Sequence, residues 1–170
     1  MNVSEEPDPA AAPGQSIFDE VTGLPNRAGW ESVLDMEERR CRRYGGNPGV
    51  VAVDVKGPLP GTGELSGPEL LRLVAETLGR ASRDTDAVAR VGERRFAVLA
   101  TEGGEAVYVL EERLRRALEE VGVVASVRAR ARRSWADLGA AWRQAESAAG
   151  SPRWVQPGNL LLNAEPPCLN

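Results

Sequence analysis

Residues 86–99 read DAVARVGERRFAVL, in which two short runs rich in valine and alanine flank the four residues GERR. Small and β-branched apolar residues on both sides of a glycine-containing turn are typical of a β-hairpin. We therefore expect strands over residues 87–91 and 96–100, joined by a turn that carries Glu93, Arg94 and Arg95.

The hairpin lies within an alternation of helical and strand patterns. Apolar residues recur at helical spacing after Asn26, which predicts an amphipathic helix that this residue caps. In chain order we expect a helix after Asn26, a strand over 49–55, a loop over 57–67, a helix from Ser66 to about residue 80, the hairpin, a helix over 107–118, a strand over 121–127, a helix after Ser134 and a short strand over 160–162. This order predicts an α/β (α+β) sandwich, with a central mixed or antiparallel sheet flanked by helices.

One domain accounts for the 170 residues, because single cores commonly organise about 100–200 residues. Residues 1–16 are rich in proline, alanine and acidic side chains, so we expect a disordered N-terminal tail. We place the domain at residues 17–156 and a C-terminal tail, which would contain the short strand, at residues 157–170.

The composition excludes several classes of function. The chain has no histidine, which rules out Ser-His-Asp triads and histidine zinc sites, and Cys41 and Cys168 belong to no C-x-x-C pair. Lys56, the only lysine, does not follow the glycines of a phosphate-binding loop. The formal net charge of −4 argues against general nucleic-acid binding, and no apolar run is long enough to span a membrane. We therefore expect a cytoplasmic protein with no cofactor and with neither nucleic-acid nor membrane partners.

Two separated motifs resemble those of one family. Residues 19–27, DEVTGLPNR, and residues 86–99 resemble the D-x-L-T-G-L-P-N-R and D-x-x-x-R-x-G-G-D-E-F-x-x-L patterns of GGDEF domains, the diguanylate cyclase family. Between them, residues 51–54 are similar to the strand that ends in the family's first metal-binding aspartate, here Asp54. The resemblance covers about residues 18–150 and implies a nucleotidyl-cyclase type of sandwich.

The resemblance also implies how the chain departs from a cyclase. The family condenses two GTP molecules with divalent metal held by two acids, and Arg94 stands where the resemblance places the second acid. A guanidinium group cannot ligate a cation and repels it at close range. Arg95 replaces a further acid, and Pro68 replaces the aspartate that binds guanine in the family.

We therefore predict a degenerate signature and a domain that is not an enzyme. The signature residues are Gly92, Glu93, Arg94, Arg95 and Phe96. No residue is assigned a catalytic role and no metal site is expected, so that Asp54 would be a relic. The two arginines either hold an anion or form an exposed tip that pairs with nearby acids, and we favour the exposed tip.

Arg83 and Asp86 reproduce the R-x-x-D motif with which family members bind cyclic di-GMP. An arginine fork can pair with phosphate oxygens, and a carboxylate can accept hydrogen bonds from guanine. The same residues also fit a solvated turn in which Asp86 caps the hairpin strand. The resemblance implies a further arginine from the next helix, which Arg113, Arg115 and Arg116 could each supply.

We expect a catalytically inactive signalling domain that senses cyclic di-GMP through Arg83 and Asp86. One alternative is a ligand-free adaptor for protein–protein interaction or dimerisation, and a protein partner or homodimer is expected in either case. A second alternative is residual GTP binding. The arginines at 128, 130, 132 and 133 alternate in part with alanine, and we interpret them as the solvated face of a strand.

Overall fold

The computed structural model describes residues 16–61, 65–133 and 136–150. Its elements follow the expected order: α1 (Arg27–Tyr44), β1 (Gly49–Pro58), α2 (Gly67–Ala81), β2 (Ala87–Arg90), β3 (Arg95–Ala100), α3 (Ala106–Glu120), β4 (Val123–Ala131) and α4 (Leu138–Gly150). The strands lie in the order β2-β3-β1-β4, and each neighbouring pair is antiparallel. The predicted α/β (α+β) sandwich is confirmed. Of the two kinds of sheet expected, mixed or antiparallel, the described residues form an antiparallel one.

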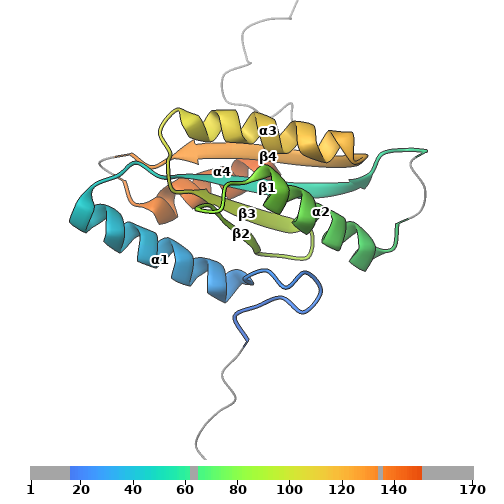
Figure 1. Ribbon diagram of the computed structural model, residues 1–170, viewed down its shortest axis with the longest axis horizontal. Coiled ribbons are helices and arrows are strands. Elements are labelled where there is room, and N and C mark those ends of the chain that lie inside the picture. Colours follow the sequence, from blue (N-terminus) through green and yellow to red (C-terminus); the bar gives the residue numbers. More distant parts are fainter. Residues whose placement is uncertain (1–15, 62–64, 134–135, 151–170) are drawn as a thin grey trace, which may run out of the picture.

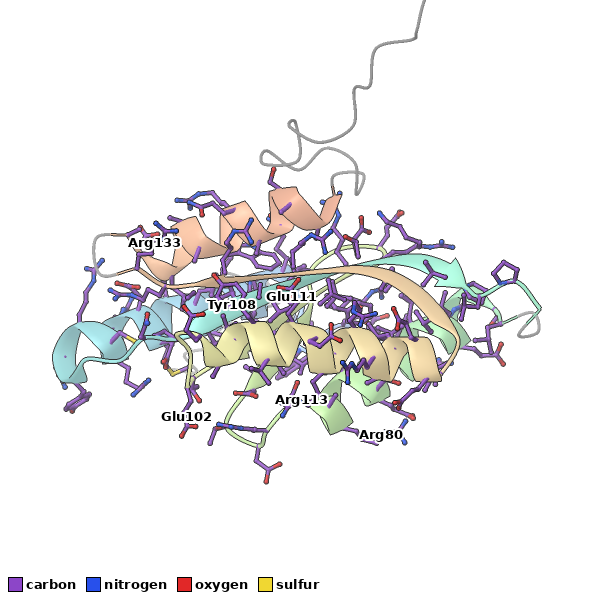
Figure 2. All side chains as sticks on the ribbon, turned by 90° about the horizontal axis from the view of Figure 1, so that it is seen from above. Arg80, Glu102, Tyr108, Glu111, Arg113 and Arg133 are labelled. Atoms are coloured by element: carbon purple, nitrogen blue, oxygen red, sulfur yellow. The ribbon has the colours of Figure 1, made fainter. Side chains whose placement is uncertain are left out.

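The helices cover both faces of the sheet. Alternate residues of β1 enter different cores: Val51 and Val53 pack with α2 and α3, whereas Val50 and Ala52 pack with α1 and α4. Figures 1 and 2 show α3 and α4 on opposite sides of the sheet. This arrangement follows from the period of two in a strand, which sends successive side chains to opposite faces.

The core beneath α1 and α4 contains a tryptophan pair. The ring centroids of Trp30 and Trp142 lie 5.2 Å apart at an interplanar angle of 69°. Trp30 is fully buried and Trp142 is nearly so. These two aromatic side chains therefore join the helix before the sheet to the helix after it.

Local sequence signals set the starts of the helices. The side chain of Asn26 accepts a hydrogen bond from the Gly29 amide, and Ser66 and Glu69 form the predicted capping box of α2. The carboxylate of Asp137 accepts a hydrogen bond from the Ala140 amide at 2.6 Å at the start of α4. These contacts satisfy amide groups that the helices leave unpaired in their first turns.

Two strands, β4 and β1, differ from their predicted bounds by more than one residue. The strand predicted over 121–127 is β4, which starts at Val123 and continues to Ala131, because Ala129 faces the core while the arginines beside it do not. Likewise β1 continues to Pro58, past an irregularity in its pairing with β4 between Val55 and Gly57. Residue Ser134, the predicted strand 160–162, the predicted C-terminal tail and all of the predicted N-terminal tail except Ser16 lie outside the described residues. No helix in the described ranges is long and apolar enough to cross a membrane.

Candidate functional site

The turn GERR faces the second half of β1. Arg95 is the register partner of Asp54, and the Val55 amide donates to the Arg94 carbonyl at 2.9 Å. An open pocket of about 320 Å³ is lined by Asp54 and by residues 91–95. The structure thus brings Asp54 and the turn together from distant parts of the sequence.

The carboxylate of Asp54 is bound by a cation. The Nζ atom of Lys56 lies 2.5 Å from Oδ2 of Asp54, and the Asp54 side chain is only 15% exposed. The guanidinium of Arg94 donates to the backbone carbonyl of Lys56 at 3.1 Å. Nowhere in the described ranges do three or more His, Cys, Asp or Glu side chains converge in a group that could hold a metal ion.

Arg90 links the opening motif to the turn. Its guanidinium pairs with Asp19 at 2.7 Å and donates to the Glu93 carbonyl at 2.8 Å. Burial raises the pKa of Asp19, but hydrogen bonds from Thr22 and Arg90 together outweigh it and hold this pKa below its usual value. Both side chains of the Asp19–Arg90 pair are mostly buried. This salt bridge therefore connects the two sequence motifs, residues 19–27 and 86–99, in the folded domain.

Glu146 adds an acid that the sequence analysis missed. Its Oε1 atom lies 3.0 Å from Nη1 of Arg27 and 3.9 Å from Nη1 of Arg95. The hydrogen bond to Glu146 raises the pKa of Arg27. Arg95 thus pairs with Glu146 of α4, and not with its sequence neighbour Glu93. No local sequence pattern around Glu146 indicates this contact.

The Arg83 and Asp86 turn lies at the other end of the sheet. The register pairs Gly49 with Ala100 at this end of β1, whereas Asp54 pairs with Arg95 toward the opposite end. Asp86 closes the turn before β2, because its carboxylate accepts from the Arg83 amide at 3.0 Å and its amide donates to the Arg83 carbonyl at 2.9 Å. The structure therefore separates the two predicted sites.

The guanidinium of Arg83 is half exposed and pairs with the exposed carboxylate of Glu102, in the loop between β3 and α3. Of the three candidate arginines on α3, Arg115 and Arg116 pair with glutamates of their own helix. Arg113 is exposed, and Figure 2 shows it well along α3 from the end at which Glu102 lies. Glu102 was not predicted as a partner, since no sequence pattern connects it to the turn.

Known proteins resemble this chain in sequence. Diguanylate cyclase DgcP of Pseudomonas aeruginosa is 35% identical over 108 residues, which make up 61% of this chain and 16% of that protein. The chain thus spans about one sixth of the length of this curated relative.

Solved structures resemble the fold. The diguanylate cyclase SiaD of Pseudomonas aeruginosa, in complex with its activator SiaC, superposes with a TM-score of 0.67 at 24% identity, over 79% of this chain and 56% of that one. The GGDEF domain of DgcB from Caulobacter crescentus, in complex with c-di-GMP, has a TM-score of 0.67 at 20% identity, over 79% of this chain and 88% of that one. At these identities the likeness establishes the fold.

The sequence model of a family described as diguanylate cyclase, GGDEF domain, matches residues 16–151. This range contains every residue that the structure describes, including Asp54, the GERR turn and the Arg83 to Asp86 turn. The chain therefore belongs to the GGDEF domain family.

Proposed function

We propose that this chain is a catalytically inactive GGDEF domain that binds cyclic di-GMP through Arg83 and Asp86. The observation that carries the inactivity is the charge around Asp54. Its carboxylate is bound by Lys56, and the turn opposite presents Arg94 and Arg95 where a metal-dependent cyclase needs an acid.

Electrostatics argue against metal-dependent condensation of GTP. A unit positive charge about 4 Å from Mg²⁺ costs roughly 2 kcal/mol even at the dielectric constant of water, and more in a partly buried site. Asp54 is mostly buried, and its nearest cation lies at 2.5 Å. Seating a divalent ion there would require the ion to displace Lys56 and to tolerate the guanidinium of Arg94, and the only carboxylates among the described lining residues are those of Asp54 and the exposed Glu93.

The Arg83 turn supports binding. Asp86 fixes the backbone of the turn, so that the Arg83 side chain starts from a defined position. Its partner Glu102 is 78% exposed, and an exposed ion pair is worth at most about 1 kcal/mol. A phosphate group of the dinucleotide can therefore replace Glu102 at little cost. The DgcB domain was solved in complex with c-di-GMP, which adds a precedent within the same fold.

Calorimetric titration with cyclic di-GMP tests the proposal. We expect saturable binding to the intact chain and at least tenfold weaker binding to Arg83→Ala. Arg39→Ala, which removes an exposed arginine of α1, is the matched control and should bind normally. Absence of binding to the intact chain would refute the ligand assignment. Product formation from GTP and Mg²⁺ would refute the inactivity.

A ligand-free adaptor is the second candidate. On α3 the adjacent residues Tyr108 and Val109 are 42% and 70% exposed, which leaves apolar surface for a partner. SiaD was solved with the activator protein SiaC, so a protein partner has a precedent in this fold. Sedimentation of the chain with and without cyclic di-GMP separates the candidates: ligand-independent self-association together with no nucleotide binding would favour the adaptor.

A further inference from the structure

A second concave surface lies where β4 ends, which we call the β4 pocket. It has a volume of about 560 Å³, and its lining includes Asn47, Tyr108, Arg130, Arg132, Arg133 and Gln144. The walls come from the turn between α1 and β1, the start of α3, the end of β4 and α4. Figure 2 shows Tyr108 near the start of α3 and Arg133 near the start of α4. None of these residues lines the pocket at the GERR turn.

The arginines of the β4 pocket differ in how their charge is balanced. Arg132 forms a salt bridge with Glu38, with two nitrogen-to-oxygen distances of 2.9 Å. Because its charge is already balanced, Arg132 lines the pocket without favouring a bound anion. Arg130 is half-buried, and its guanidinium donates to the backbone carbonyl of Ala129 at 2.7 Å. Within the described ranges no carboxylate forms a salt bridge with Arg130, unlike Arg128 and Arg132 beside it on the chain. The carboxylate of Glu105 also lines the pocket but forms no ion pair with Arg130, so the half-buried charge of Arg130 has no salt-bridge partner among the described residues.

A half-buried cation without a salt bridge favours an anion in the same cavity, because burial of the Arg130 charge is otherwise offset only by its hydrogen bond to Ala129. The other lining groups can assist. The amides of Asn47 and Gln144 and the hydroxyl of Tyr108 offer hydrogen-bond donors beside Arg130. Guanidinium pairs with phosphate oxygens through two parallel bonds, which makes phosphate the best-matched anion.

The size of the β4 pocket indicates more than an inorganic ion. Its volume lies within the roughly 300–1,000 Å³ of small-molecule sites, far above that of one phosphate ion. Tyr108 is 42% exposed and lines the cavity, so its ring offers a surface for the organic part of a ligand. We propose that the β4 pocket binds a small organic phosphate, with Arg130 as the principal contact to the phosphate group.

The site is independent of the cyclic di-GMP proposal. Arg83 and Asp86 precede β2, at one edge of the sheet, whereas Arg130 lies on β4 at the other edge. The loop between β3 and α3 touches both regions, because Glu102 pairs with Arg83 while Gly104 and Glu105 line the β4 pocket. Asn47 and Gln144 line the β4 pocket from outside this shared loop, so their amides report binding there independently of the Arg83 turn.

Amide resonances of the isotope-labelled chain, titrated with AMP and separately with inorganic phosphate, test the proposal. We expect AMP to shift the amides of Asn47, Tyr108 and Gln144 saturably, and to bind at least fivefold more tightly than inorganic phosphate. Arg130→Met keeps the aliphatic stem and should weaken AMP binding at least tenfold. The control Arg39→Met and the turn variant Arg83→Ala should leave it unchanged.

Three results would overturn the proposal. The first is no saturable shift of these amides at about 10 mM AMP, where a ligand with a Kd of 1 mM is about 90% bound. The second is equal affinity for AMP and inorganic phosphate. The third is unchanged AMP affinity in Arg130→Met. If that variant does not fold, Arg130→Lys replaces it: this change keeps the charge but loses the fork, and an affinity equal to that of the unmodified chain would contradict the role of Arg130.

Discussion

Replacement of Glu38 by glutamine removes a negative charge that joins three elements. The carboxylate of Glu38 on α1 accepts two hydrogen bonds from Arg132 at the end of β4, one from Arg42, and one from the amide of Leu138 at the start of α4. The bonds from Arg132 are the main cause that lowers the pKa of Glu38 from 4.5 to about 2. The side chain is 13% exposed, so solvent screens these contacts little.

The lowered pKa of Glu38 determines how much unfolding free energy the Glu38→Gln substitution removes and how that loss changes with pH. A difference of about 2.5 pKa units corresponds to roughly 3 kcal/mol of unfolding free energy. Because the folded-state pKa is the lower one, this stability is fully present above about pH 5 and is lost as the pH falls toward 2. Glu38→Gln should therefore cost about 3 kcal/mol at pH 7 and progressively less toward pH 2.

Urea unfolding followed by tryptophan fluorescence measures the difference, at several pH values from 7 down to the lowest at which both chains fold. Glu31→Gln is the control, because its side chain is 69% exposed and pairs with Arg27 only at 3.7 Å. We expect that control to change the unfolding free energy by less than about 0.5 kcal/mol. A difference between the unmodified chain and Glu38→Gln that stays constant with pH would refute the reasoning.

Two further substitutions test the Arg83 site and the core. Glu102→Gln removes the carboxylate that competes with a ligand for Arg83, so calorimetry should give up to about fivefold tighter cyclic di-GMP binding. Weaker binding would mean that Glu102 helps to hold the ligand. Trp30→Ala removes a fully buried ring that contacts Trp142 and should lower the unfolding free energy by about 3–5 kcal/mol. A loss below about 1 kcal/mol in urea unfolding would contradict its place in the core.

Local patterns were sufficient to predict most of the fold. Asn26 and the pair Ser66 and Glu69 cap helices where the sequence indicates, since capping depends on residues within one turn. The strand predicted over 121–127 ends too early, because Arg128 and Arg130 interrupt its apolar run. The separate interpretation of the arginines at 128, 130, 132 and 133 as one face of a strand agrees with β4 at 128 and 130, whereas 132 and 133 follow its end at Ala131.

The site was predictable only in part. The adjacency of Asp54 and the GERR turn follows from the family resemblance, and Lys56 could have been assigned to Asp54, because residues two apart on a strand share a face. Contacts made by Glu146 and Glu102 join elements far apart in sequence. Such pairs depend on how helices and loops pack on the sheet, which one sequence does not specify locally.

The central claim is that the positive charges around Asp54 prevent a divalent ion from binding beside the GERR turn. Paramagnetic broadening of amide resonances by Mn²⁺ in the presence of GTP tests this claim most directly. We expect the amide resonances of Asp54 and of residues 92–95 to stay sharp in the unmodified chain. Arg94→Glu restores an acid opposite Asp54 and should broaden them, which shows that the assay detects a metal at this position. Selective broadening of the same amides in the unmodified chain would mean that a divalent ion binds beside the turn, and would contradict the account.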